Sequence, residues 1–595
     1  MNQTDLDHLP EWNLADLYPG RDSDALKRDL ERMRDGAAAF EDRFRGRLAS
    51  LDGDALAAAV REYEGWEELA GRVMSYAYLS YAENMADAEG ARFFQDMQER
   101  ITAITAKLLF FTLEINRIDD EALSEAYSAS PALRHYRPWL ERVRKMRPYQ
   151  LSDELEKALH EKSVVGRAAW VRLFDETMAA LEFGIDGETL GLEAVLDRLS
   201  DKDRIRREAA YRALSAVFSD HLRLFVLITN TLAKDKEIED GWRGFRTPEQ
   251  SRHLANDVEG EIVDALFDAV RGAYPQLSHR YYRLKARWMG LEKLEAWDRN
   301  APLPEEDDRL IGWDEARETV LGAYGRFSPV LASLGQRFFD NDWIDAPARP
   351  GKAPGAFAHP TVPSAHPYLL LNYLGKPRDV MTLAHELGHG VHQLLAAKQG
   401  ALMADTPLTL AETASVFGEM LTFRALLDAA PDARRKRVLL AGKVEDMLNT
   451  VVRQIAFYDF ERRLHRARRE GELPAEAIGE IWMQTQRESL GDAFRLEDSY
   501  ASFWCYIPHF IHSPFYVYAY AFGDCLVNAL YATYQQQPEG FGEKYLKMLE
   551  AGGTLGHRDL LAPFGLDAAD PAFWRRGLSV IGGFIDELEA LGTDG

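Results

Sequence analysis

The sequence contains little cysteine and no long hydrophobic run. Only two cysteines, Cys505 and Cys525, occur among 595 residues. A secreted chain of this length would often carry more, so we expect a reducing, cytoplasmic location and a fold without disulfides. No stretch of about 18 uninterrupted apolar residues occurs, which predicts no membrane span and no membrane partner.

Positive charge is also in deficit. Lys and Arg total 71 against 96 Asp and Glu, which gives a net charge of −25 at pH 7. A surface of this sign repels phosphate backbones, so we expect no nucleic-acid partner. The first residues, M-N-Q-T-D-L-D-H-L-P-E-W, have neither a basic nor an apolar segment, so we expect no secretory signal. No pattern indicates an obligate protein partner.

Most of the chain has the apolar spacing of α-helices. Apolar residues recur three and four positions apart in 54–113 and 201–237, and in 121–159 between three prolines. We predict a mostly α fold with two regions. An N-terminal helical region, 1–195, would form a wall or lid, and a catalytic region would span 196–595.

Two short stretches instead predict β-structure. Asp186-Gly187 lies between alternating apolar residues in 181–192, as in a β-hairpin. Residues 346–375 contain six prolines and three glycines, too many for a regular helix. Within them, 367–373 suits a strand, placed just before the histidine-rich segment described next. We therefore expect a small β element beside the functional site.

One segment carries the chemistry, T-L-A-H-E-L-G-H-G-V-H-Q-L-L, residues 382–395. In a helix, His385 and His389 lie about 40° apart around the axis and about 6 Å along it. Two imidazoles so placed can bind one metal ion, and Glu386, about 100° round, can take a proton from metal-activated water. Asp379 suits the start of this helix. The pattern predicts one Zn²⁺ per chain.

Alternatives exist within the same run. His389 and His392 are three residues apart and could pair, but that choice leaves Glu386 too far back to act as the base. We therefore expect His392 to pack in the interior or to support a ligand. A buried helix that merely contains histidines is the plainer alternative, and the complete pattern is rare by chance.

A catalytic zinc needs a third protein ligand and one open position. The segment T-L-A-E-T-A-S-V-F-G-E, 409–419, offers Glu412 and Glu419 on one helix face. We prefer Glu412, although Thr409-x-x-Glu412 also fits a capping box. Glu419 could be a surface residue or could orient a ligand histidine.

These motifs resemble those of oligoendopeptidase F, within the thimet-oligopeptidase-like group of zinc peptidases. The resemblance rests on H-E-L-G-H-G-V-H and A-E-T-A-S-V-F-G-E, and it extends to G-A-F, H-P-Y-L-L-L-N-Y, Y-Y-R-L-K-A-R-W and W-N-L-A-D-L-Y-P. It implies a bowl-like, multi-helix zincin fold with a deep central channel that admits only short peptides. Matched residue by residue, His385, His389 and Glu412 are the expected zinc ligands and Glu386 the expected general base.

The resemblance also points to a C-terminal segment, Y-I-P-H-F-I-H-S-P-F-Y-V-Y-A-Y-A-F-G. It implies that His509, Tyr518 and Tyr516 stabilise the transition state, with His512 and Tyr520 as weaker candidates. An aromatic core stripe is the alternative, because tyrosine often packs in the interior with its hydroxyl bonded.

Gly355 and Ala356 are the expected substrate-binding residues, since an extended peptide can add to a strand edge there. The alternative is an ordinary buried loop. The predicted function is zinc-dependent hydrolysis of internal bonds in short peptides. A zinc carboxypeptidase on a related scaffold is the second candidate, and it would need a cationic group for the free substrate carboxylate. A non-catalytic peptide-binding protein is the third, and the intact Glu386 disfavours it.

Overall fold

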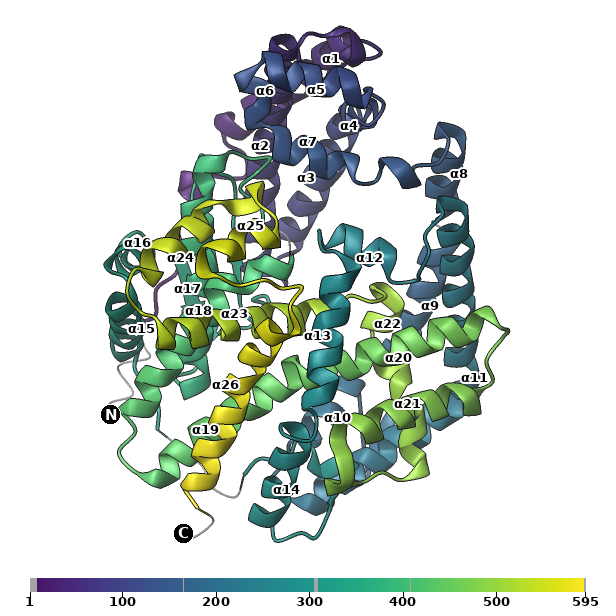
Figure 1. The fold of residues 1–595 in the computed structure, drawn as a ribbon, viewed down its shortest axis with the longest axis vertical. Coiled ribbons are helices and arrows are strands. Elements are labelled where there is room, and N and C mark those ends of the chain that lie inside the picture. Colours follow the sequence, from purple (N-terminus) through teal and green to yellow (C-terminus); the bar gives the residue numbers. More distant parts are fainter. Residues whose placement is uncertain (1–7, 164, 304–308, 407, 593–595) are drawn as a thin grey trace. The chain divides into compact units, whose positions relative to one another are not determined.

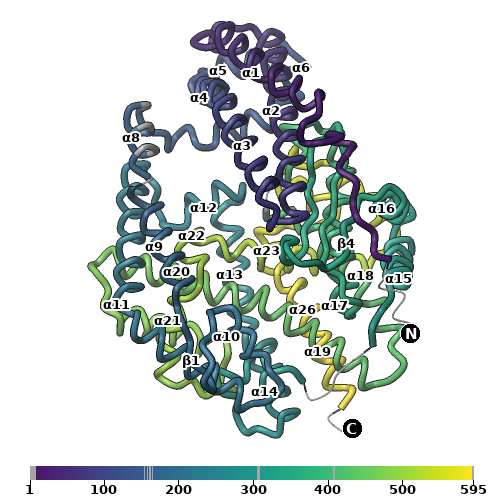
Figure 2. Tube along the Cα trace, turned by 180° about the vertical axis from the view of Figure 1, so that it is seen from behind, coloured from purple at the N-terminus to yellow at the C-terminus, as the bar shows by residue number. Residues whose placement is uncertain are grey.

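The computed structural model describes residues 8–163, 165–303, 309–406 and 408–592. Within these ranges the chain is mostly α-helical, with three small sheets. The mostly α prediction is confirmed. The chain forms two compact units, each assembled from separate stretches of sequence, so each is described by itself (Figures 1 and 2).

The first unit comprises residues 1–148, 308–429 and 533–566. Its helices are α1 (Asp24–Phe44), α2 (Gly53–Ala82), α3 (Ala88–Thr105), α4 (Leu109–Ile115), α5 (Asp120–Ala129), α6 (Pro131–His135), α7 (Arg137–Arg144), α15 (Trp313–Phe327), α16 (Pro329–Asp340), α17 (Pro377–Ala396), α18 (Leu408–Asp428), α24 (Phe541–Glu550) and α25 (His557–Leu561). Short 3₁₀ turns are η2 (Leu14–Asp16), η3 (Leu48–Ser50), η6 (Ala397–Gln399), η9 (Gly552–Thr554) and η10 (Ala562–Phe564).

The sheet of the first unit has the order β4 (Ile344–Pro347), β6 (Tyr368–Tyr373), β5 (Phe357–His359). Strand β6 is central, parallel to β4 and antiparallel to β5. Its apolar run Tyr368–Leu371 is buried, which explains why these residues form the middle strand. The strand expected at 367–373 is thus confirmed. Strand β5 lies at an edge, and α17 begins four residues after β6 ends.

The second unit comprises residues 149–307, 430–532 and 567–595. Its helices are α8 (Asp153–Ser163), α9 (Arg167–Ala180), α10 (Leu192–Arg198), α11 (Arg204–Arg243), α12 (Gln250–Ala255), α13 (Gly260–Ala273), α14 (Ser278–Trp288), α19 (Ala433–Thr450), α20 (Val452–Arg469), α21 (Ala475–Leu490), α22 (His509–His512), α23 (Tyr518–Gln536, up to Ala532 in this unit) and α26 (Pro571–Ala590). The 3₁₀ turns are η4 (Arg147–Tyr149, at the boundary), η5 (Ala296–Asp298), η7 (Gly491–Ala493) and η8 (Asp498–Tyr506).

Two minor sheets complete the second unit. Strands β3 (Leu294–Glu295) and β7 (Phe494–Arg495) pair in parallel. Strands β1 (Phe183–Ile185) and β2 (Glu188–Leu190) form the expected hairpin. Its turn residues Asp186 and Gly187 have φ angles of 55° and 84°, the backbone that an Asp-Gly turn favours.

The compact units do not follow the predicted regions. The second unit begins at Tyr149 and takes residues from three stretches, whereas the sequence suggested a boundary near Val195. Contacts between residues distant in sequence define the units, and no local pattern reports them. The predicted regions 1–195 and 196–595 therefore remain predictions, as does the central channel.

Candidate metal centre and active site

The histidine run forms the helix α17, as its spacing predicts. The helix starts with Pro377 in its first turn, and Asp379 accepts backbone hydrogen bonds from Leu374 and Lys376 at 2.9 and 3.0 Å. Asp379 therefore caps the helix start from inside the first turn. The core face of α17 contains Leu383, Leu387 and Val391, all completely buried, while Leu394 and Leu395 are partly exposed.

Helix α18 crosses α17 at unusually short range. A Cβ atom added to Gly388 would lie 2.5 Å from the carbonyl oxygen of Ala414 and 2.7 Å from Cα of Ser415. Only a residue without a side chain fits there, so Gly388 lets the two backbones approach. This close crossing brings the first turns of α18 over the histidines of α17.

Three side chains converge at the crossing. The Nε2 atoms of His385 and His389 lie 3.3 and 3.5 Å from the same Oε2 atom of Glu412. One donor atom from each of the three residues lies within 4.8 Å of the other two, a spacing that suits one shared metal ion. The structure thus brings the three predicted ligands together, and their binding of a metal ion stays a prediction.

Each imidazole is oriented by a partner behind it. Nδ1 of His385 lies 3.1 Å from Oε2 of Glu419, so this carboxylate holds the ring with Nε2 toward Glu412. The ring of His389 is hydrogen-bonded to the backbone of Ala411. Glu412 and Glu419 are seven residues apart on α18, and they contact opposite nitrogens of one ring.

His392 lies outside the group of converging donor atoms. It is buried, and burial lowers its pKa to about 4, so the ring is neutral at pH 7. Its ring is hydrogen-bonded to the backbone of Ala411, the same residue that His389 contacts. His392 thus packs in the interior, beside a ligand.

Electrostatics at the centre favour a cation. Burial alone would lower the pKa of His385, but hydrogen bonds to Glu412 and Glu419 raise it to about 10. Burial would raise the pKa of Glu412, but the two histidines, with Ser415, lower it to about 2. The protonated His385 and the ionised Glu412 therefore form an ion pair. A metal ion that replaced the imidazole proton would meet two imidazoles and a carboxylate, donors that suit a divalent transition-metal ion. The residues present fit the expected metal.

Glu386 lies on α17 beside this centre, with 7% of its surface exposed. Burial, together with the Glu412 carboxylate, raises its pKa to about 7 against the opposing effect of His385. The backbone N–H of Ala358 in β5 donates a hydrogen bond to its carboxylate. A carboxylate with a pKa near neutrality suits proton transfer at physiological pH.

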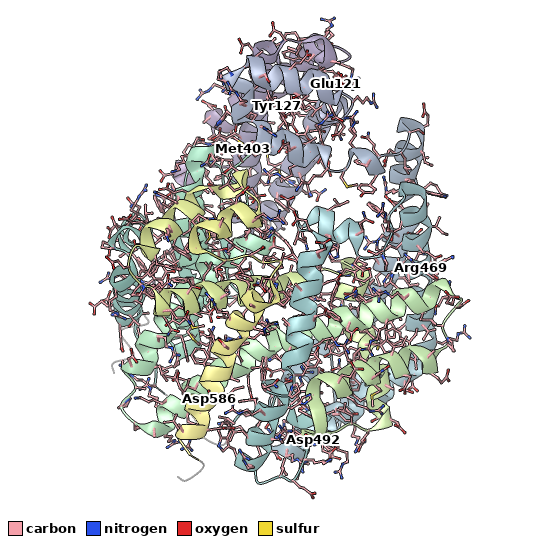
Figure 3. The ribbon with its side chains drawn as sticks, in the orientation of Figure 1. Glu121, Tyr127, Met403, Arg469, Asp492 and Asp586 are labelled. Atoms are coloured by element: carbon pink, nitrogen blue, oxygen red, sulfur yellow. The ribbon has the colours of Figure 1, made fainter. Side chains whose placement is uncertain are left out.

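The loop that joins α17 to α18 is held by hydrogen bonds to residues of α2, α7 and η9. The backbone N–H of Leu402 donates to Glu64 of α2 at 3.3 Å, and Arg142 of α7 donates to the Leu402 carbonyl at 3.4 Å. The carbonyl of Met403, labelled in Figure 3, accepts from Gly553 at 2.8 Å. The N-terminal helices thus restrain the connection between the helices that bear the metal ligands.

Gly355 and Ala356 immediately precede the edge strand β5. Gly355 has a φ angle of 77°, and its carbonyl accepts a hydrogen bond from the Asn372 side chain at 2.8 Å. Both residues are incompletely buried. They lie next to the strand whose Ala358 contacts Glu386, so the small β element does lie beside the candidate site.

The C-terminal candidates belong to the second unit. Tyr518 is completely buried, and its hydroxyl lies 3.1 Å from Nδ1 of His253 and 3.0 Å from the Asn256 amide nitrogen. Nε2 of His509 lies instead 3.3 Å from the hydroxyl of Tyr520, which is 36% exposed.

Tyr516 is also near His509, and the two rings are nearly parallel with centroids 6.2 Å apart. His512 is exposed and faces Asp175, with Nε2 and Oδ1 2.7 Å apart. Tyr516 and Tyr520 therefore share surroundings with His509, whereas Tyr518 and His512 face other partners.

Sequence reasoning missed two backbone groups. The Ala358 N–H and the backbone of Ala411 contact the candidate base and a candidate ligand, respectively. Backbone groups carry no residue-type signal, so no pattern could indicate them. His253 and Asn256, which bind Tyr518, lie more than 250 positions from it, and no local spacing connects them.

Comparisons with known proteins agree with this geometry. The model of Peptidase family M3 matches residues 325–580, and the model of Oligopeptidase F matches residues 114–183. Oligopeptidase PepF of Bacillus subtilis is 24% identical over 592 residues, covering 98% of this chain and 87% of the relative. The oligoendopeptidase F homolog of Lactococcus lactis subsp. lactis is 24% identical, covering 99% and 98%.

Solved structures share the fold. A crystal structure of a peptidase from Chlamydophila abortus has a TM-score of 0.87 at 22% identity, covering 99% of both chains. Oligoendopeptidase-F from Enterococcus faecium has a TM-score of 0.69 at 20% identity, covering 95% of this chain and 99% of that one. Fold and site together define a metallopeptidase of the zincin type. The chain belongs to the oligoendopeptidase F family of peptidase family M3 and is a metalloendopeptidase.

None of the described helices combines the length and apolar character needed to cross a lipid bilayer.

Proposed function

We propose that the protein is a zinc-dependent endopeptidase that hydrolyses internal bonds of short peptides. One Zn²⁺ would be held by His385, His389 and Glu412. The observation that carries this proposal is the convergence of these donor atoms within 4.8 Å, with Glu386 adjacent on α17. Two imidazoles and one carboxylate, with a position left open, form a donor set typical of catalytic zinc.

A zinc ion held there would acidify water and polarise the carbonyl of the bond to be cleaved. Glu386 would accept the proton from the attacking water and deliver it to the leaving amine. Its raised pKa, about 7, lets one carboxyl group serve in both transfers near neutral pH. The Ala358 N–H orients that carboxylate, and Glu419 orients His385.

His509 would donate a hydrogen bond to the oxyanion that forms during attack, together with Tyr516 or Tyr520. Both hydroxyl-bearing rings lie beside His509, at the separations given above. The hydroxyl of Tyr518 is occupied by His253 and Asn256, so Tyr518 would act by fixing the start of α23 and not by contacting substrate. This proposal modifies the role expected for Tyr518 from the family resemblance.

Substrate would bind in extended form beside β5. Gly355 and Ala356 lead into this edge strand, and an edge strand offers unpaired backbone groups to an added peptide. A peptide held there would lie next to Glu386, because Ala358 of the same strand contacts that residue.

The decisive experiment uses internally quenched peptides blocked at both ends. The protein, stripped with a chelator, should lose hydrolysis and regain it with one equivalent of Zn²⁺. Mass spectrometry of a mixed peptide library should show internal cuts. If blocked peptides resist while unblocked ones lose single C-terminal residues, the carboxypeptidase alternative replaces this proposal. Hydrolysis that survives complete metal removal contradicts both.

A further inference from the structure

Two buried tyrosines lie beside the crossing of α17 and α18, and each donates a hydrogen bond to a backbone carbonyl there. We call them the tyrosine pair. The hydroxyl of Tyr324, in α15, donates to the carbonyl of Ala384 in α17 at 2.6 Å. The hydroxyl of Tyr545, in α24, donates to the carbonyl of Thr413 in α18 at 2.7 Å. Both tyrosines come from helices that pack against α17 (Figure 1).

The two carbonyls are next to proposed metal ligands in the chain. Ala384 directly precedes His385, and Thr413 directly follows Glu412. A side chain extends from the backbone of its own residue, so a bond to the adjoining peptide group fixes the point from which the ligand extends. Each tyrosine thus restrains the backbone beside one ligand.

Tyr324 bonds to α17 at the place where this helix comes closest to α18. Within an α-helix the carbonyl of Ala384 also accepts from the N–H of Gly388, four residues on. Gly388 is the residue that lets the two helix backbones approach. The Tyr324 hydroxyl therefore adds a second hydrogen bond to a carbonyl that is already part of the crossing.

Gly418 makes room for Tyr324 on the α18 side. A Cβ atom added to Gly418 would lie 2.1 Å from the hydroxyl oxygen of Tyr324 and 2.7 Å from its Cζ. Only a glycine lets the hydroxyl lie against the backbone of α18 while it bonds to α17. Gly418 directly precedes Glu419, whose carboxylate orients His385. One side chain therefore contacts the backbone beside the ligand and the backbone beside its orienting partner.

The two tyrosines are close to each other as well. Both line one small cavity at the crossing, together with Gly388, Ala414 and Gly418. Burial raises the pKa of each hydroxyl above its usual 10, and the Glu419 carboxylate raises that of Tyr324 further. Both hydroxyls therefore keep their protons at neutral pH and remain hydrogen-bond donors.

A buried tyrosine hydroxyl usually bonds to some acceptor, which by itself stabilises only the fold. Two other buried tyrosines of the first unit illustrate this case. The hydroxyls of Tyr368 and Tyr373 donate to the carbonyls of Asn13 and Ile311, which lie outside α17 and α18. The tyrosine pair differs from them because its acceptors lie on the two helices that carry the proposed ligands.

We propose that Tyr324 and Tyr545 are positioning residues of the metal centre. Together they fix the separation of α17 and α18, and with it the distance between the donor atoms of His385 and Glu412. Tyr324 also holds the backbone before Glu419, so that its carboxylate stays beside His385. Neither tyrosine contacts metal or substrate. The inference rests on the proposed function, because it assumes that these ligands bind a metal ion.

The test compares Tyr324→Phe and Tyr545→Phe with the parent protein. Each change removes one hydroxyl and keeps the ring, so the fold should be retained. Competition with a chelator measures zinc affinity, which should fall about tenfold in each variant, the lower end of the loss expected when support for a ligand is removed. The absorption spectrum of the Co²⁺-loaded protein reports coordination geometry, and it should change at saturating Co²⁺.

Tyr368→Phe is the matched control within the same unit. Its hydroxyl is also buried and also donates to a backbone carbonyl at 2.7 Å. The variant should lower the thermal midpoint of the metal-free protein about as much as Tyr545→Phe does, because each loses one buried hydrogen bond. Its zinc affinity and Co²⁺ spectrum should equal those of the parent.

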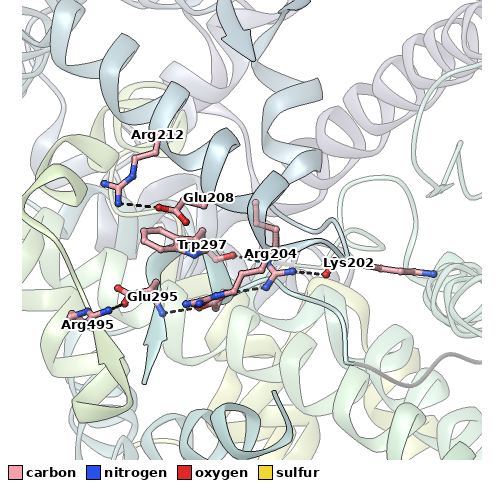
Figure 4. A network of polar contacts seen from close by, with 9 residues as sticks. Lys202, Arg204, Glu208, Arg212, Glu295, Trp297 and Arg495 are labelled. Carbon is pink, nitrogen blue, oxygen red and sulfur yellow. Dashed lines mark hydrogen bonds and ion pairs between the residues drawn. The ribbon is translucent and has the colours of Figure 1, made fainter. Parts of the chain in front are cut away.

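A second control lies in the other compact unit (Figure 4). Arg204 of α11 binds the buried carboxylate of Asp298 through Nε at 3.0 Å and Nη2 at 2.9 Å. Arg204→Gln removes this ion pair, so it should lower the thermal midpoint and leave zinc affinity unchanged. A tenfold fall in zinc affinity in either control would show that any loss of stability weakens the centre, and would overturn the proposal.

The proposal fails for either tyrosine whose phenylalanine variant matches Tyr368→Phe in both zinc affinity and Co²⁺ spectrum. Weaker zinc binding together with a changed spectrum supports it. If the parent protein itself binds no zinc, the proposed function is overturned and this inference with it. If the parent binds zinc and both variants match it, only the inference is overturned, so the two failures are distinguishable without measuring turnover.

Discussion

The metal centre and the His509 segment present their side chains in different ways. At the proposed metal centre, His385, Glu386 and His389 lie on one unbroken helix. Their spacing in the sequence therefore determines where each side chain lies around the helix axis. Residues 509–520 instead pass from α22 through Phe515, whose φ angle is 60°, into α23. The departure from helical backbone turns Tyr516 and Tyr518 toward different partners. Sequence spacing predicts geometry only while one regular element continues.

The largest effect expected is at Glu386. Glu386→Gln removes the proton acceptor and preserves the size of the side chain, so kcat should fall by about 10²–10⁴-fold while metal content stays near one per chain. Quenched-peptide kinetics and metal analysis on the same sample measure both. Asp379→Asn, which alters the cap of the same helix, is the control for a general effect on α17. Near-normal turnover by Glu386→Gln would remove its role as the base.

The second prediction distinguishes the tyrosines. Tyr520→Phe or Tyr516→Phe should lower kcat by about 10²–10³-fold with little change in metal content, if one of them donates to the oxyanion as proposed. Tyr518→Phe should mainly lower the thermal midpoint, because its hydroxyl is buried between His253 and Asn256. The result that contradicts this comparison is a kcat loss confined to Tyr518→Phe.

A third effect concerns metal affinity. Glu419→Gln leaves the three proposed ligands in place but weakens the partner that orients His385, so zinc affinity should fall by about 10–100-fold. Competition with a chelator measures the affinity, and added zinc should restore most of the activity. Glu412→Gln is the matched comparison on the same helix face. If the two variants lose affinity equally, the distinction between ligand and orienting residue fails.

The smallest effect is a pH dependence of stability. Burial lowers the folded-state pKa of His392 to about 4, below its usual 6.5, so folding favours the neutral ring. The resulting stability is present above pH 6.5 and is lost as pH falls toward 4. Between pH 7 and pH 5 the loss should be about 2 kcal/mol. Denaturant unfolding of the metal-free protein measures this change. In His392→Gln, the free energy of unfolding should fall less between pH 7 and pH 5 than in the parent protein. An equal fall in both proteins would contradict the lowered pKa of His392.

Much of the fold and site follows from local sequence. The spacing in 382–395 predicts α17 and its metal-facing side, and Asp186-Gly187 predicts the hairpin turn. The sequence already favours Glu412 over Glu419 as the ligand, but the positions of both carboxylates around His385 depend on the close crossing at Gly388, a contact between two helices that no local pattern reports.

The hydrogen bond from Ala358 to Glu386 connects the proposed substrate-binding strand with the proposed general base. Strand β5 pairs with β6 on one side, and the Ala358 backbone is hydrogen-bonded to Glu386. A peptide that docks along this strand would therefore contact the same amide group that orients the Glu386 carboxylate, the proposed proton acceptor. If substrate binds along β5, its binding and the orientation of the Glu386 carboxylate would be coupled through this amide, and a change confined to the Ala358 side chain would leave the coupling intact. Only a change to the amide itself, as in Ala358→Pro, would separate them.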